Sequence, residues 1–74
     1  MAKNHDFNIL DKSGNIVGER EESLCVIGMG PQSQTFAALH HTSDLDDAKK
    51  YIKHHSQGER GWRYDIKNKE GVSV

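Results

Sequence analysis

Histidine is the residue type with the most obvious capacity for chemistry in this sequence. Five histidines occur in 74 residues, and four of them form the adjacent pairs His40-His41 and His54-His55. Imidazoles are common zinc ligands, and Cys25 or an aspartate could complete a tetrahedral set. Adjacent residues, however, point to opposite faces of a strand or about 100° apart on a helix, so neither pair can chelate a metal by itself. The sequence therefore predicts no metal site, and it places one histidine pair at a sheet edge and the other near the end of a helix.

Glycines and serines are the other residues on which chemistry could rest. Gly28 and Gly30 follow an apolar run, as they would in a phosphate-binding loop, but position 33 is serine where a dinucleotide fingerprint has its third glycine, and Pro31 interrupts the pattern. The serines fall in turn-like or terminal segments, outside any nucleophile-elbow pattern. A chain this short also has little room for a water-excluding pocket. We therefore expect no catalytic residue, no cofactor and no enzymatic activity.

Cys25 is the only cysteine, which excludes an intramolecular disulfide. It lies in the apolar run Leu24-Cys25-Val26-Ile27, where a free cysteine is usually buried and unreactive. Small secreted domains usually carry several disulfides, and the first residues lead into no apolar stretch of the signal-peptide type. No apolar run approaches the roughly 18–20 residues of a membrane span. We therefore expect a cytoplasmic protein without membrane contact.

Charge is divided unevenly along the chain, although the net charge is only −1. Residues 1–48 hold eight acids and three bases, whereas residues 49–69 hold seven bases and two acids. A charge-segregated surface of this kind steers association with a charged partner. We predict that the domain docks on a protein, as an inhibitor or an adaptor. The acidic residues predicted to contact that partner are Glu21, Glu22, Asp46 and Asp47.

The basic segment supports a second hypothesis, which is nucleic-acid binding. Its lysines and arginines are interleaved with Trp62 and Tyr64, and single strands are bound by phosphate contacts together with base stacking on aromatic rings. Two observations weigh against it: a dedicated binder is usually basic overall, and both aromatic residues share a strand face with Ile66, which predicts that they belong to the core. The residues that would form this interface are Lys49, Lys53, Arg60, Arg63 and Lys67.

One amphipathic helix, predicted from about Asp44 to Gln57, carries Asp46 and Asp47 of the acidic set and Lys49 and Lys53 of the basic set. Ser43 is the expected N-cap, with Asp46 in the place of the capping-box acid. Acids crowd the first turn and bases follow toward the other end, as the helix dipole favours, and Gly58 would stop the helix. A face at helical spacing is expected to pack on a sheet; it consists of Leu45, Ala48, Tyr51, Ile52 and His55.

Two hairpins with the same spacing are predicted at the two ends of the chain. Phe7 and Ile9 alternate with polar neighbours before a turn at residues 11–15, which leads into an apolar pair at positions 16 and 17. Tyr64 and Ile66 repeat this layout before a turn at residues 68–71, which leads into Val72-Ser73-Val74. Three matched positions are too few to indicate a duplication.

Two further strands are predicted between the hairpins. Residues 24–29 form an apolar run rich in strand-favouring side chains. Residues 34–41 fit either a strand or a helix, and the strand is favoured because residues 30–33 would then close a hairpin with the preceding run. Residues 1–74 are thus expected to fold as one small α+β domain of the order β-β-β-β-α-β, with or without a short final strand, in which the helix packs on one face of a small antiparallel sheet.

Overall fold

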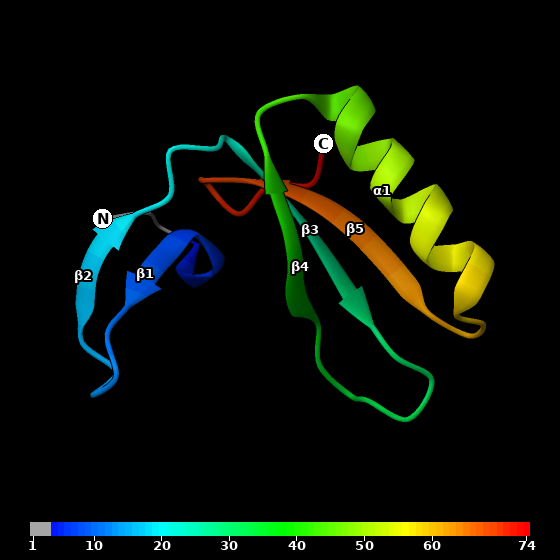
Figure 1. Ribbon diagram of the computed structural model, residues 1–74, viewed down its shortest axis with the longest axis horizontal. Helices are drawn as coiled ribbons and strands as arrows, with labels where there is room; N and C mark the ends of the chain where they lie inside the picture. Colours follow the sequence, from blue (N-terminus) through cyan, green and yellow to red (C-terminus); the bar gives the residue numbers. More distant parts are fainter. Residues whose placement is uncertain (1–3) are drawn as a thin grey trace.

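The structure is a computed structural model that describes residues 4–74. A short 3-10 helix, η1 (His5–Phe7), begins it. The other elements follow in the predicted order: β1 (Asn8–Leu10), β2 (Ile16–Glu19), β3 (Leu24–Met29), β4 (Ala37–Thr42), α1 (Leu45–Gly58) and β5 (Arg63–Asn68). The α+β class is therefore confirmed (Figure 1). Residues 34–41 fitted either a strand or a helix, and they form the expected strand from residue 37 onward.

The strands form two antiparallel sheets, whereas one sheet was expected. β4, β3 and β5 pair in that order, with β3 in the centre, and β1 pairs with β2. Figure 1 shows the hairpin of β1 and β2 set apart from the three-stranded sheet, beyond β4. Phe7 explains the separation: it lies in η1 and not in a strand, and its side chain is fully buried against the larger sheet. The chain therefore turns at the base of the hairpin before pairing begins.

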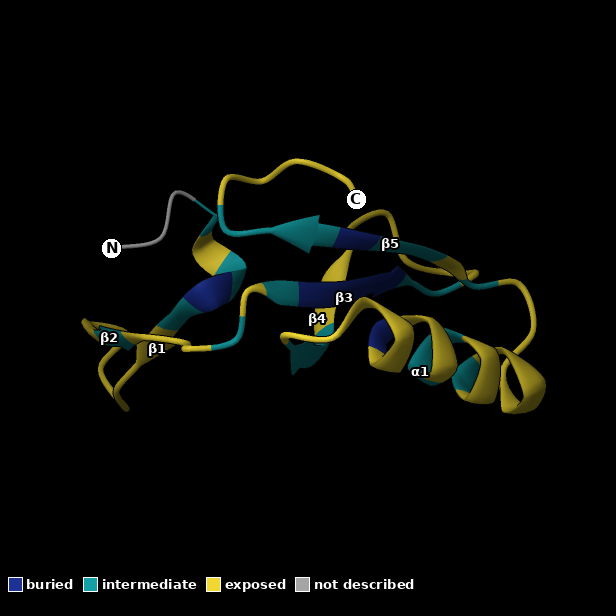
Figure 2. Cartoon of the chain, turned by 90° about the horizontal axis from the view of Figure 1, so that it is seen from above, coloured by how far each residue is buried: buried dark blue, intermediate teal, exposed yellow. Residues whose placement is uncertain are grey.

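Helix α1 covers one face of the three-stranded sheet. Val26 and Ile66 are register partners in β3 and β5, and both pack with Ala48 of the helix. Tyr51 and Ile52 complete this layer, as the helical spacing predicts. Leu45 was expected in the same layer, but it is 38% exposed because it lies at the first position of the helix, near the end of the sheet. Figure 2 shows the buried residues along β3, in the middle of β5 and near the start of α1.

Phe7 packs on the opposite face of β3. It contacts Cys25 and Ile27, which alternate with the residues that face the helix, so β3 is buried on both sides. The ring of His41 meets the Phe7 ring edge-on, with centroids 5.7 Å apart, and its Nε2 lies 2.7 Å from the carbonyl oxygen of Asp6. The predicted burial of Cys25 is therefore observed.

The ends of α1 differ from the prediction by one residue at each end. Asp44, not Ser43, is the N-cap, and its carboxylate accepts a hydrogen bond from the Asp46 N–H at 3.0 Å. No capping box forms, because the hydroxyl oxygen of Ser43 instead accepts from the N–H of Ser23. Gly58 is the last helical residue, and Glu59 caps the helix in an extended conformation.

The two predicted hairpin turns adopt the same hydrogen-bonding pattern. The Asp11 side chain accepts from the N–H groups of residues 13 and 15, and the Asn68 side chain accepts from those of residues 70 and 72. Gly14 and Gly71 both have positive φ, which glycine adopts without strain. After the second turn, the expected final strand is reduced to one bridge between Lys67 and Ser73. Within residues 4–74, no helix has the length and apolar character to cross a membrane.

Candidate functional site

The two acidic clusters meet at one end of the molecule. Residues 20–23 connect β2 to β3, and residues 43–44 connect β4 to α1. The hydrogen bond from the Ser23 N–H to the Ser43 hydroxyl oxygen, 3.2 Å, ties these connections together, and Leu24 pairs with Thr42 beside it. Figure 1 shows both connections at the same end of the three-stranded sheet. Glu21 and Glu22 are thereby brought to the end of the sheet where the helix begins.

The acidic side chains at this end differ in how far other residues of the protein engage them. Asp44 caps the helix, and Asp46 is exposed in the first turn. The Asp47 carboxylate lies 2.9 Å from Nε2 of His40 in β4. Hydrogen bonds from His40 and then from Thr42 lower the pKa of Asp47 from its ordinary value of 3.8. Asp47 is therefore partly engaged within the protein, whereas Glu21 and Asp46 are exposed to a partner.

The predicted basic interface does not form one surface. Lys49 and Lys53 are exposed on α1. In β5, Ile66 faces the helix, so the alternation of strand side chains directs Arg63 and Lys67 to the opposite side of the sheet. Asp65 lies between these two bases on the same side and carries the opposite charge. The structure thus divides the basic residues between two sides of the molecule, with Arg60 in the connection between α1 and β5.

Trp62 and Tyr64 belong to an aromatic cluster at the end of α1. His55 meets the Trp62 ring edge-on, with centroids 4.8 Å apart, and its Nδ1 is hydrogen-bonded to the Tyr64 hydroxyl at 2.5 Å. Partial removal from water raises the pKa of Tyr64, and the negative charge of Glu59 adds to this rise. Both aromatic residues are half-buried, and their rings pack against each other and against His55. His55 is accordingly a packing residue.

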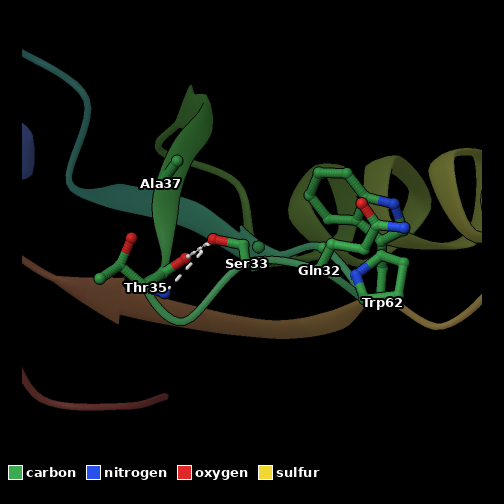
Figure 3. Close-up of a pocket in the computed structure, with 8 residues that line it drawn as sticks. Gln32, Ser33, Thr35, Ala37 and Trp62 are labelled. Atoms are coloured by element: carbon green, nitrogen blue, oxygen red, sulfur yellow. Dashed lines mark hydrogen bonds between the residues drawn. The ribbon is translucent and has the colours of Figure 1, made fainter.

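A pocket of about 550 Å³ opens beside Trp62 (Figure 3). Small residues at the ends of β3 and β4 line it together with the loop that joins these strands, and the only large side chain among them is the indole. The hydroxyl of Ser33 donates to the carbonyl oxygen of Thr35 within this loop. None of the lining residues carries an ionisable side chain; they are Gly28, Gly30, Pro31, Gln32, Ser33, Thr35, Ala37 and Trp62. The pocket offers apolar contact and no acid, base or activated nucleophile.

Histidine, cysteine and acidic side chains do not gather into a metal site. In the part of the chain that the structure describes, no three of them come close enough to hold a metal ion. His40 and His41 face opposite sides of β4, because one contacts the helix and the other contacts Phe7. Burial, reinforced by the charge of Asp6, raises the pKa of the Cys25 thiol from 9.0 to about 11. This thiol is therefore poorly suited to act as a nucleophile or a metal ligand.

Sequence reasoning missed the exposed apolar side chains of the first hairpin. Ile9 and Leu10 are adjacent in β1, and Ile16 and Val17 are adjacent in β2; all four are exposed. The signal was present in the sequence, because adjacent apolar residues in a strand place apolar side chains on both of its faces.

Comparison with known proteins adds no relative: the chain matches no protein-family model, no curated protein and no solved structure.

Proposed function

We propose that this domain acts by binding another protein, as an inhibitor or an adaptor, and that it catalyses no reaction. The observation that carries the proposal is the hydrogen bond between Ser23 and Ser43, which gathers acids from two segments about twenty residues apart in the sequence at one end of the fold. Carboxylates grouped in this way attract a basic partner from a distance and orient it during association. The partner surface expected to fit is basic.

The basic residues support nucleic-acid binding less well. A phosphate backbone would have to reach Lys49 and Lys53 on the helix and also Arg63 and Lys67 behind the sheet, and Asp65 would lie in its path. Trp62 and Tyr64 are engaged with His55. A single buried cysteine with no disulfide is consistent with a reducing compartment, so we place this function in the cytoplasm.

The test measures association kinetics with a protein captured from a host lysate by the immobilised chain, with and without nuclease. The partner should survive nuclease treatment. Glu21→Lys and Asp46→Asn should each lower the association rate constant, and a double variant should lower it by about tenfold at low salt, with a smaller change in the dissociation rate. Lys49→Glu and Lys53→Glu are matched controls on the exposed face of the helix, and they should leave the association rate unchanged or raise it. Loss of the partner with nuclease, together with weaker binding by the two lysine variants, would contradict the proposal and favour nucleic acid.

A further inference from the structure

The hairpin of β1 and β2 carries four of the eight exposed large hydrophobic residues of the described chain. Ile9, Leu10, Ile16 and Val17 are 40, 57, 43 and 63% exposed. Across the hairpin Ile9 pairs with Gly18, and Leu10 pairs with Ile16. Ile9 and Leu10 are neighbours in β1 and therefore point to opposite faces of this two-stranded sheet, and a register shift opposite Val17 interrupts the regular pairing in β2. Neither face is covered by α1, which packs on β3 and β4.

The base of the hairpin is nevertheless fixed to the rest of the molecule. The Arg20 N–H donates to the carbonyl oxygen of Phe7 at 2.7 Å, and the Phe7 side chain is buried against β3. Nζ of Lys69 lies 3.7 Å from the Glu19 carboxylate. The hairpin is thus held in one place while its strands project, as Figure 1 shows. A hairpin of only two strands is marginally stable in water, and three or more strands with an apolar face are needed for independent stability.

We propose that this hairpin is a self-association surface, and that it packs against the hairpin of a second copy of this chain in a two-fold symmetric dimer. Two hairpins in contact supply four strands, and each hairpin covers the aliphatic side chains on the face that the other presents to it. A two-fold interface uses the same patch on both subunits, so the patch must tolerate its own charge. The strands of the hairpin carry one charged residue, Glu19, and Lys69 neutralises it. A second copy therefore meets no repulsion there, whereas the acidic end suits a basic partner.

The exposed surface area of the chain is larger than that of a compact monomer, as expected when a projecting hairpin lacks a packing partner. The chain exposes 5264 Å², whereas a compact monomer of 8.3 kDa exposes about 4,600 Å². The chain thus exposes about 700 Å² more than a compact monomer of its mass, and covering the projecting hairpin in a dimer would bring the exposed area toward the compact value. This dimer proposal does not depend on protein binding by the acidic end of the fold, because it uses different residues and needs no other protein.

Analytical ultracentrifugation of the purified chain, from micromolar to millimolar concentrations, tests the proposal. The chain should form a dimer in a concentration-dependent way, and Val17→Lys should raise the dimer dissociation constant by about tenfold or more, because it places a charge in the contact. Val74→Lys is the matched control, since Val74 is 56% exposed and lies outside the hairpin. It should dimerise like the wild type. Helix circular dichroism and the emission of Trp62 show whether each variant is folded.

Cross-linking locates the contact without relying on a disruptive variant. Val17→Cys should oxidise to a covalent dimer, and Val74→Cys should not, while Cys25 remains unreactive because it is buried. A chain that stays monomeric at millimolar concentration would overturn the proposal. So would a dimer that Val17→Lys leaves intact and Val74→Lys disrupts, or one in which only Val74→Cys cross-links, because each would place the contact elsewhere.

Discussion

The imidazole of His40 lies flat against the phenol ring of Tyr51, with ring centroids 4.7 Å apart and the planes within 2° of parallel. The same imidazole reaches Asp47 through Nε2 at 2.9 Å. Asp47 and Tyr51 are one turn apart on α1, on the same face of the helix. A single side chain of β4 therefore fixes the helix at two points, and it couples the acidic end of the fold to the helix–sheet interface.

Asp47→Asn should destabilise the protein at neutral pH and have no such effect in acid. The pKa of Asp47 is depressed in the folded state, chiefly by the hydrogen bond from His40. A carboxylate of this kind stabilises the fold above its unfolded-state pKa, and the contribution is lost as the pH falls through the folded-state value. The difference in melting temperature from the wild type should therefore shrink as the pH falls below the ordinary pKa of 3.8 and disappear once the carboxyl group is protonated in both states. Asp46→Asn shares the first turn without the hydrogen bond to His40, and it should have a smaller effect; equal effects would contradict the coupling.

Phe7→Ala should cost about 3–5 kcal/mol in the free energy of unfolding, because it removes a fully buried aromatic ring from the face of β3 opposite the helix. Phe36 is the only other phenylalanine and is 44% exposed, so Phe36→Ala should cost less than about 1 kcal/mol. Urea denaturation followed by the emission of Trp62 measures both values. Equal costs would mean that Phe7 does not anchor the hairpin.

Gly28→Ala should disturb Trp62. A Cβ at position 28 would lie 2.5 Å from the Cδ1 of Leu39 and 3.2 Å from the indole ring. The Leu39 methyl group can rotate away, but the indole is held by His55, so we expect a cost of about 1–3 kcal/mol and a shift of Trp62 emission to longer wavelength. Gly18→Ala is the control in another strand, where the new Cβ would make an ordinary contact at 3.7 Å. An unchanged emission spectrum for Gly28→Ala would show that the ring does not rest on this glycine.

Cys25 should make the fold less stable at alkaline pH. Burial raises the pKa of its thiol to about 11 in the folded state from an ordinary 9.0, so between these values the unfolded chain releases a proton that the folded chain keeps. The free energy of unfolding should then fall as the pH rises, by at most about 1.4 kcal/mol per pH unit. Cys25→Ala lacks this proton, and its stability should fall less steeply between pH 9 and 11. Parallel curves for the two proteins would refute the assignment.

Local chemistry made the individual elements predictable from the sequence. Acids at the start, bases toward the end and an apolar stripe specified α1, and an uninterrupted apolar run specified the central strand β3. The turns at Asp11 and Asn68 were predictable because a side-chain acceptor three residues before a glycine can satisfy the backbone of a tight turn. The N-cap was missed because Ser43 and Asp44 are both good caps, and the distant N–H of Ser23 decides between them.

The arrangement of the elements depended on long-range contacts that no local pattern encodes. The burial of Phe7 against β3 separates the hairpin from the larger sheet. The pairing of β3 with β4 brings residues 20–23, which connect β2 to β3, beside the start of the helix. The acidic residues could therefore be named from the sequence, but their meeting could not. The division of the basic residues was likewise set by the register of β5, in which Ile66 faces the helix.

Oligonucleotide binding should be negligible at physiological ionic strength, because the basic residues do not form a continuous path for a phosphate backbone. Affinity for a generic single strand, measured by fluorescence anisotropy at several salt concentrations, gives the number of phosphates contacted from the slope of log K against log salt. We expect weak binding even at low salt, with a shallow slope that Lys49→Ala and Arg63→Ala change independently, since the two residues lie on different sides of the molecule. A continuous interface would instead give a steep slope, roughly 0.7 per phosphate for a single strand, which either variant would reduce. Submicromolar, salt-sensitive binding would make the nucleic-acid hypothesis the better account of this domain.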